Sequence, residues 1–422
     1  MSEKYFPLDK ASLEKLTETY PTPFYLYDEK GILENAAKIK TAYSVFPGYK
    51  QYFAVKALPN PFILKLLAKE GFGADCSSYT ELLLAEMAGI TGEDIMFSSN
   101  ETPAKEYRLA RTMGAIINLD DYTHIDFLEK TAGLPDIVSF RYNPGPLKEG
   151  NAIIGRPEEA KYGLTREQII QGFTLLREKG LKRFALHTMV ASNELSISYH
   201  AETARMLFEL AAAIFEKTGL RLEFINLGGG VGIPYRPEQE AVDYQILAAE
   251  IQKEYRGIIM PAGLDPIGIR TEWGRVVTGP YGWLVSRAMH KKEIYRNYIG
   301  LDSCMADLMR PALYGAYHHM SIPGKENDPL SETYDVVGSL CENNDKFAIQ
   351  RKLPKIETAA ETDGSGGDFA VIHDAGAHGR AMGFNYNGKL RCGELLLRKD
   401  GSVLQIRRPE TPDDYFATLN LN

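Results

Sequence analysis

The chain has 422 residues, of which 44% are hydrophobic and 25% are charged, which is an ordinary mix for a globular protein with room for two domains. Its formal net charge of −8 disfavours a nucleic acid or an anionic membrane as the main partner. No signal-peptide segment and no apolar run of membrane-spanning length is evident in the sequence. Four scattered cysteines without a CxxC pair predict reduced thiols in a cytoplasmic protein, with no disulfide framework and no metal site.

The first predicted elements are a strand at residues 21–28 and a helix at residues 31–45. From Tyr52 onward, strand-like and helix-like segments alternate regularly. Eight strands are predicted, at residues 52–58, 74–77, 95–99, 115–119, 137–143, 184–190, 224–227 and 267–272. Amphipathic helices are clearest at residues 61–70, 80–88, 103–113 and 201–217. This repeat predicts an α/β protein built on a (β/α)8 barrel of the TIM type.

The alternation stops near Gly274, and the composition of the chain changes. Short extended runs follow at residues 276–277, 332–340, 368–372, 395–397 and 403–407, separated by segments rich in glycine and aspartate. This pattern favours a mainly antiparallel β-domain. We therefore expect a barrel at residues 31–274, a β-domain at residues 275–422, and an N-terminal segment, residues 1–30, that joins the β-domain.

The first predicted barrel strand leads directly into Lys56, and Pro59 and Pro61 follow it. Lys56 can be a lysine that has reached the exit of its strand, where its amine is solvated. Alternatively, its amine is held in a dry pocket and serves as a nucleophile toward a carbonyl group. This segment alone leaves both interpretations open.

Barrel enzymes carry their chemistry at the carboxyl ends of the strands. The predicted ends form a rim of mixed charge: Lys56, Asp75, Asn100, Arg141, Asn143, His187, Ser192, Gly228, Gly229, Gly230, Glu272 and Arg275. Structural roles explain one or two of these residues but explain the whole set poorly.

Two of these ends suggest a cofactor. The three glycines at residues 228–230 allow backbone N–H groups to surround a phosphate, although a flexible turn has the same composition. Glu272 and Arg275 can form a plain ion pair, but a buried acid would also suit the pyridinium nitrogen of pyridoxal phosphate. A lysine, a phosphate loop and an acid together are what that cofactor requires.

Two further pairs lie beyond the barrel. Arg310 and Tyr314 are four residues apart around Pro311, so they can share a helix face and bind a carboxylate, or they can belong to a surface helix. Cys341 precedes Glu342, and neighbouring negative charge favours a protonated thiol that donates a proton. A buried structural cysteine is the alternative.

Taken together, these motifs resemble those of the fold-type III pyridoxal-phosphate decarboxylases, and most nearly those of the diaminopimelate decarboxylases. Six motifs occur in the family's order between about residues 23 and 394: AVKA (54–57), GGG (228–230), ExGR (272–275), RPALY (310–314), CE (341–342) and GAxG (376–379). The resemblance implies a barrel followed by a β-domain, and a homodimer in which each active site is completed by the other subunit.

The resemblance also implies roles for individual residues. Lys56 would bind the cofactor covalently, and Cys341 of the other subunit would protonate the product carbon. The cofactor would also be held by Asp75, His187, Ser192, Gly229, Gly230, Glu272, Gly274, Arg275 and His378. The substrate would be recognised by Arg275, Arg310, Tyr314 and Glu342. The implied reaction is decarboxylation of meso-2,6-diaminopimelate at its D-centre to give L-lysine.

Three positions depart from the family pattern. Met189 stands where the family has a histidine stacked on the cofactor ring, and His187, two residues earlier on the same strand face, is a candidate replacement. His378 replaces a tyrosine that reaches the phosphate, and Trp273 replaces a proline. Such changes leave open a substrate such as D-lysine, D-ornithine or an amino-acid conjugate.

Two other functions fit parts of the pattern. A racemase on the same barrel would need a second base opposite Lys56. A cofactor carrier without activity would leave the β-domain motifs around Arg310, Tyr314 and Cys341 without a purpose.

Overall fold

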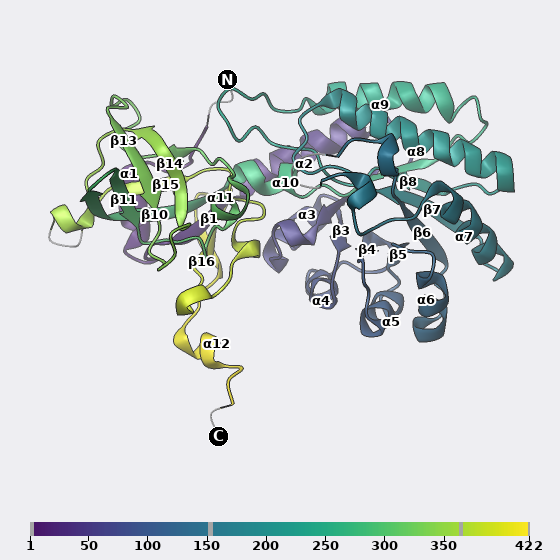
Figure 1. The fold of residues 1–422 in the computed structure, drawn as a ribbon, viewed down its shortest axis with the longest axis horizontal. Coiled ribbons are helices and arrows are strands. Elements are labelled where there is room, and N and C mark those ends of the chain that lie inside the picture. The colour runs from purple at the N-terminus through teal and green to yellow at the C-terminus, as the bar shows by residue number, and fades with distance from the viewer. Residues whose placement is uncertain (1–3, 151–154, 363–365, 421–422) are drawn as a thin grey trace. The chain divides into compact units, whose positions relative to one another are not determined.

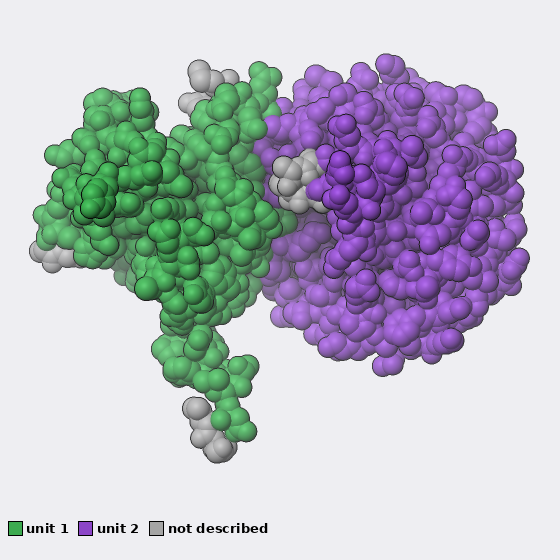
Figure 2. Space-filling model, in the orientation of Figure 1, with its two compact units in different colours: residues 1–32, 234–240, 278–422 green, residues 33–233, 241–277 purple. Residues whose placement is uncertain are grey.

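The computed structural model describes residues 4–150, 155–362 and 366–420. The chain forms two compact units, shown in different colours in Figure 2. The barrel unit comprises residues 33–233 and 241–277, and the β unit comprises residues 1–32, 234–240 and 278–422. The short stretch at residues 234–240 therefore leaves the barrel unit directly after the glycine-rich loop and belongs to the β unit.

The barrel unit contains a closed barrel of eight strands, as predicted. The strands are β2 (Lys50–Ala54), β3 (Gly73–Cys76), β4 (Ile95–Ser98), β5 (Ile116–Leu119), β6 (Ile137–Tyr142), β7 (Arg183–Thr188), β8 (Phe224–Asn226) and β9 (Gly268–Thr271). Each strand pairs in parallel with the next, and β9 closes the barrel on β2 through Arg270 opposite Lys50. All their carboxyl ends therefore lie at one mouth of the barrel.

Helices cover the outside of this barrel (Figure 1). They are α2 (Glu29–Tyr43), α3 (Pro61–Lys69), α4 (Tyr79–Met87), α5 (Ala104–Thr112), α6 (His124–Ala132), α7 (Arg166–Glu178), α8 (Ile197–Thr218) and α9 (Tyr244–Ile258). Side-chain caps fix several starts: Asn60 accepts a hydrogen bond from the N–H of Phe62, and Ser78 accepts one from the N–H of Glu81. Inside the barrel, six strands contribute one apolar side chain each to a buried cluster: Tyr52, Met96, Ile116, Ile137, Ala185 and Phe224.

The β unit is built on a nine-stranded, mainly antiparallel sheet. Its strands are β1 (Phe24–Asp28), β10 (Gly282–Glu293), β11 (Asn297–Leu301), β12 (Met320–Ser321), β13 (Glu332–Val337), β14 (Lys346–Leu353), β15 (Phe369–Ile372), β16 (Gly393–Leu397) and β17 (Val403–Arg407). Strand β1 lies between β10, to which it is antiparallel, and β16, to which it is parallel. Phe24, Leu26 and Trp283 belong to the core beneath this part of the sheet.

Short helices complete the chain: α1 (Lys10–Thr17), α10 (Arg275–Thr278), α11 (Arg310–Tyr314) and α12 (Pro412–Phe416). Helix α10 corrects the extended run that was predicted at residues 276–277. Its two valines favour a strand locally, but their side chains are buried and the N–H of Val277 donates to the carbonyl of Gly274. Among the described residues, no helix is long and apolar enough to cross a membrane.

Candidate functional site

At the mouth of the barrel, the buried carboxylate of Glu272 follows β9 and receives hydrogen bonds from three strands. Its Oε1 atom accepts from Asn226 Nδ2 at 2.6 Å, from Ser98 Oγ at 3.3 Å and from Asn118 Nδ2 at 3.4 Å. Asn118 Nδ2 also lies 2.6 Å from Ser98 Oγ, so the donors form one network. Such convergence on a single oxygen favours the charged form of the acid.

The second oxygen of Glu272 faces His187 on β7. His187 Nε2 lies 3.0 Å from Glu272 Oε2, and both side chains are buried. Burial acts to raise the pKa of Glu272, but His187, the hydrogen bond from Asn226 and the charge of Lys56 together lower the pKa below its ordinary value. The site therefore holds an anionic carboxylate away from water.

Asp75, at the end of β3, is a second buried acid with the opposite behaviour. Burial, and then the nearby charge of Glu272, raise its pKa well above the ordinary value, and the charge of Lys56 offsets only part of this. Among the described residues, the buried atoms Asp75 Oδ1 and His187 Nδ1 have no hydrogen-bond partner. The same mouth thus contains one ionised acid and one acid that retains its proton more readily.

Lys56 lies at the same mouth, and its side chain is exposed. Strand β2 ends at Ala54, earlier than predicted, and a 3-10 turn over Val55–Ala57 follows. The neighbours Val55 and Ala57 are buried. The charge of the lysine still lowers the pKa values of Asp75, Glu81 and Glu272, so the ammonium group faces the acids of the site.

The glycine-rich loop packs directly on the backbone that follows β7. Gly228 and Gly230 have φ angles of +70° and +104°. A Cβ atom would lie 2.0 Å from the carbonyl oxygen of Thr188 at the first position, and 2.6 Å from that of Ala191 at the second. Only glycine fits these two positions without displacing backbone.

Three more predicted residues are grouped around this loop and the turn of Lys56. Arg275 Nη2 donates to Ser192 Oγ at 3.3 Å. A Cβ atom on Gly274 would lie 2.7 Å from Ala57 Cβ, so a glycine is needed where the end of β9 approaches the turn. Ser192, Gly274 and Arg275 thus lie on segments that border the same mouth.

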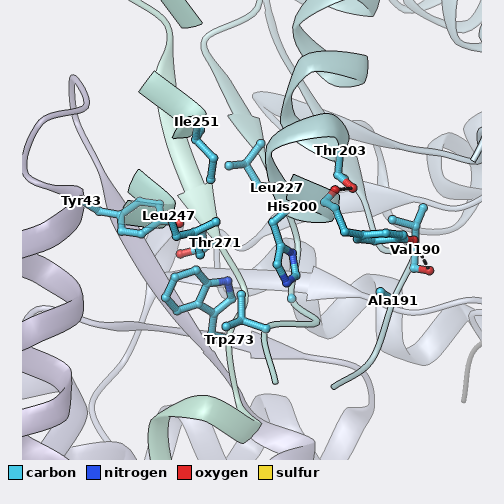
Figure 3. A pocket seen from close by; sticks show the side chains of 13 residues that line it. Tyr43, Val190, Ala191, His200, Thr203, Leu227, Leu247, Ile251, Thr271 and Trp273 are labelled. Atoms are coloured by element: carbon cyan, nitrogen blue, oxygen red, sulfur yellow. Dashed lines mark hydrogen bonds between the residues drawn. The ribbon is translucent and has the colours of Figure 1, made fainter. Parts of the chain in front are cut away.

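Next to the glycine-rich loop is a pocket that the sequence did not indicate (Figure 3). It is lined by Gly229 and Val231 of the loop, by residues of α2, α8, α9 and β9, and by residues of the segment after β7, with the ring of His200 in its middle. His200 Nε2 lies 3.1 Å from the carbonyl oxygen of Glu194. Burial lowers the pKa of His200, so the ring is neutral at pH 7 and donates to this carbonyl.

The other predicted residues belong to the β unit. Arg310 is buried at the start of α11, with Nη1 3.0 Å from His318 Nε2 and the guanidinium 4.6 Å from the ring centroid of Tyr235. Tyr314, at the end of the same helix, is 52% exposed, so the two side chains differ in burial. Sequence reasoning did not identify His318 or Tyr235 as neighbours of Arg310.

The remaining three residues lie in loops of the β unit. Cys341 is an exposed free thiol, and Glu342 beside it is half-buried. Asp345 holds their loop through hydrogen bonds to its carboxylate from the N–H groups of Leu340 and Met305. His378 has a left-handed backbone, with φ of +53°.

Sequence reasoning missed Ser98, Asn118 and Asn226 as partners of Glu272. Each is polar and stands within or at the end of a short strand: Ser98 ends β4, Asn118 lies in β5 and Asn226 ends β8. A polar residue at that place on several strands is the signal that could have identified them.

Comparison with known proteins gives a consistent result. Residues 33–279 match the family described as "Pyridoxal-dependent decarboxylase, pyridoxal binding domain". The chain is 42% identical to Protein TabA of Pseudomonas amygdali pv. tabaci, over 99% of this chain and 95% of that protein. It is 32% identical to diaminopimelate decarboxylase of Methanothermobacter thermautotrophicus, over 97% and 94%.

A solved structure agrees over the whole chain. Diaminopimelate decarboxylase from M. jannaschii, in co-complex with L-lysine, superposes with a TM-score of 0.88 at 28% identity and covers 100% of this chain and 97% of that one. The family match spans more than half of the chain, and its fold-type III architecture agrees with the barrel and sheet described above. The chain therefore belongs to the pyridoxal-dependent decarboxylases and is a pyridoxal-phosphate-dependent decarboxylase.

Proposed function

We propose that this protein decarboxylates meso-2,6-diaminopimelate at its D-centre and releases L-lysine and carbon dioxide. The similarity to diaminopimelate decarboxylases along nearly the whole chain supports this substrate, as does a similar solved structure that contains L-lysine. The observation that carries the reaction type is the anionic Glu272, buried at the mouth of the barrel and facing the charge of Lys56.

The residues at the mouth of the barrel fit pyridoxal phosphate. The pyridinium nitrogen needs an anionic partner, and Glu272 is kept ionised by His187 and Asn226. The phosphate needs N–H and cationic donors in a narrow space, which Gly229, Gly230, Ser192 and Arg275 supply. The buried atoms Asp75 Oδ1 and His187 Nδ1 are polar groups suited to a ligand. Gly274 and His378 are further proposed contacts.

When bound, the cofactor supplies an aldehyde that bonds to an amine and a conjugated ring that accepts the electron pair left by carbon dioxide. In this proposal Lys56 Nζ provides the amine that anchors the cofactor and gives way to the amine of the substrate. Glu272 holds the ring nitrogen in its protonated form. Cys341 Sγ then gives its proton to the product carbon.

Recognition of the far end of the substrate is assigned to Arg275, Arg310, Tyr314 and Glu342. Two arginines suit the second carboxylate of diaminopimelate, and a glutamate suits its second amine. Buried Arg310 disfavours a purely cationic far end, because a substrate such as D-lysine would meet positive charge there without compensation.

We further propose a homodimer in which Cys341 and Glu342 complete the active site of the other subunit. The exposure of Cys341 is compatible with a contribution to a second chain. The cysteines are free thiols, which fits the reducing cytoplasm.

A substrate panel tests the proposed function. Release of carbon dioxide would be measured with meso-diaminopimelate, D-lysine and D-ornithine, each with purified enzyme and added pyridoxal phosphate. We expect kcat/KM to be at least about 100-fold higher for meso-diaminopimelate, because two charge-assisted contacts to its far carboxylate are lost in the other two. Comparable or higher values for D-lysine or D-ornithine would contradict the proposed substrate.

A second candidate is decarboxylation of a related amino acid or amino-acid conjugate. It is favoured by Met189 and His378, which depart from the diaminopimelate decarboxylase pattern. Turnover of a conjugate in place of free diaminopimelate would support this candidate.

A further inference from the structure

Asn226 contacts both the glycine-rich loop and Glu272 through one side chain. It is the last residue of β8, is fully buried, and lies in register with His187 on β7 and Arg270 on β9. Its Nδ2 atom donates to Glu272 Oε1 at 2.6 Å, the shortest of the three hydrogen bonds described for this oxygen. Its Oδ1 atom accepts from the N–H of Gly228 at 2.9 Å.

The two partners fix the orientation of the amide. The backbone N–H of Gly228 can only donate, and the ionised carboxylate of Glu272 can only accept. A flipped amide would place donor against donor and acceptor against acceptor, so only the observed orientation satisfies both groups. A fully buried side chain cannot replace a lost partner with water, so loss of either hydrogen bond of Asn226 is expected to lower the stability of the folded protein.

A backbone bond completes the connection between the glycine-rich loop and the acid. The N–H of Glu272 donates to the carbonyl oxygen of Gly228 at 2.8 Å. Gly228 is thus held at its N–H by the Asn226 side chain and at its carbonyl by Glu272. A Cβ atom on Gly229 would lie 2.7 Å from the carbonyl oxygen of Glu272, so the next residue of the loop also packs on the acid's backbone.

We propose that Asn226 is a positioning residue that ties the glycine-rich loop to Glu272, so that one side chain sets the distance between the phosphate end and the ring end of the cofactor site. This inference rests on the proposed placement of the cofactor. It assigns no contact between Asn226 and substrate. Its consequence is that binding of the phosphate and binding of the ring are not independent.

Asn118 offers a matched control, because it shares only one of the two functions. It is buried and donates to the same oxygen of Glu272, at 3.4 Å, but its other bond goes to Ser98. Loss of Asn118 therefore affects the acid without releasing Gly228. Asn226→Asp separates the arms in the opposite way: an aspartate still accepts from Gly228, but it cannot donate to Glu272 and adds like charge beside it.

The experiment measures cofactor binding without substrate. Dissociation constants for pyridoxal phosphate and for unphosphorylated pyridoxal would be obtained from cofactor absorbance for the wild-type chain and for Asn226→Ala, Asn226→Asp and Asn118→Ala. The quantity compared is the phosphate gain, defined as the ratio of the pyridoxal constant to the pyridoxal phosphate constant. Binding of inorganic phosphate, by competition, provides a second measure of the loop.

We expect the phosphate gain to fall at least about tenfold in Asn226→Ala, the equivalent of one lost hydrogen bond, and pyridoxal itself to bind more weakly. In Asn118→Ala we expect weaker pyridoxal binding with an unchanged phosphate gain. Asn226→Asp should keep the phosphate gain, bind pyridoxal more weakly, and shift the pH at which the cofactor spectrum changes. This shift is a readout that a purely structural role would not produce.

Two results would overturn the inference. An unchanged phosphate gain in Asn226→Ala would show that Asn226 does not hold the loop, as would an equal fall in Asn118→Ala. If Asn226→Ala fails to fold, Asn226→Leu takes its place, because leucine has a similar size but neither accepts from Gly228 nor donates to Glu272; an unchanged phosphate gain in that variant would also overturn the inference. A phosphate gain near 1 in the wild-type chain would instead overturn the proposed cofactor placement, and with it this inference.

Discussion

His187 and Glu272 form a buried pair across adjacent ends of the barrel, with His187 Nε2 3.0 Å from Glu272 Oε2. The two residues come from β7 and from the residue after β9, which are separated by β8 in the barrel. Their proximity therefore depends on the pairing of both strands with β8. The pair helps to keep the carboxylate charged where water does not reach it.

Removal of this histidine should weaken the folded protein at neutral pH. The pKa of Glu272 is lowered from its ordinary value of 4.5, so its stabilising contribution is present above that value and is lost as pH falls through the lower, folded-state pKa. We expect His187→Gln to lose about 1–3 kcal/mol of unfolding free energy at pH 7 and less below pH about 4. Urea unfolding of the cofactor-free chain across this pH range measures the loss of unfolding free energy at pH 7 and at acidic pH. In a Glu272→Gln background, His187→Gln should lower the unfolding free energy by less. An equal loss in both backgrounds would contradict the pairing of His187 with Glu272.

Asp75→Asn should act in the opposite direction. Burial and Glu272 raise the pKa of Asp75, so the folded chain binds this proton more tightly than the unfolded chain does, and stability falls as pH rises from 3.8 through the folded-state pKa. Because Asp75→Asn removes this titrating group, the melting temperature of the cofactor-free variant should be a few degrees above that of the wild-type chain at pH 7. At acidic pH the two melting temperatures should be equal. The same change should weaken cofactor binding. Thermal unfolding gives the melting temperature, and cofactor titration gives the affinity for pyridoxal phosphate. A melting temperature below that of the wild-type chain at pH 7 would contradict the expected stabilisation.

Lys56→Ala should abolish covalent attachment of the cofactor. We expect no yellow absorbance band after incubation with pyridoxal phosphate, no borohydride-trapped adduct at position 56, and a loss of activity of at least about 1,000-fold. Lys50 begins the same strand and pairs with Asp94, so Lys50→Ala is a suitable control that should retain the band. An adduct that persists in Lys56→Ala would show that another amine serves.

Gly228→Ala should destabilise the chain more than a glycine substitution of similar backbone conformation elsewhere. Gly219 has φ of +72°, close to the +70° of Gly228, but a Cβ atom there would meet nothing within 4 Å. We expect about 1 kcal/mol of destabilisation for Gly219→Ala, and at least about 3 kcal/mol with loss of cofactor binding for Gly228→Ala. Chemical denaturation distinguishes the two. Similar costs would mean that the loop moves freely away from Thr188.

Cys341→Ala should separate cofactor binding from catalysis. The thiol is exposed, so we expect stability to change by less than about 0.5 kcal/mol. Cofactor binding should be retained, while protonation of the product is slowed or misdirected. Product analysis in deuterated water checks this through the rate and stereochemistry of deuterium incorporation. An unaltered rate and product would show that another group donates the proton.

The barrel was predictable because each of its strands and helices is indicated by a pattern within a short segment of the sequence. The strands are short runs rich in apolar residues, and most are followed by an amphipathic helix. The strands of the β unit were only partly predicted: β10, β11, β12 and β14 were missed, although β10 spans Gly282–Glu293. Two of its partners, β1 and β15, come from distant parts of the sequence, so local patterns do not mark these pairings.

The candidate site was predictable by residue type but not by arrangement. The strand-end rule identified Asp75, His187 and Glu272, which do lie together. It could not show that Lys56 lies in a 3-10 turn after the strand, since that depends on where β2 stops hydrogen bonding. Nor could it show which neutral donors converge on Glu272, because Asn118 and Asn226 become neighbours only when the parallel strands close into a ring.

The position of β1 has a consequence for how the protein is made. Residues 24–28 are synthesised well before their two neighbours in the sheet, β10 at residues 282–293 and β16 at residues 393–397. The barrel strands can begin to pair during translation, whereas β1 lacks its first partner until β10 has emerged and its second until β16 has emerged. A nascent chain stalled before residue 393 would thus expose the apolar edge of this strand, and binding of chaperones should concentrate there.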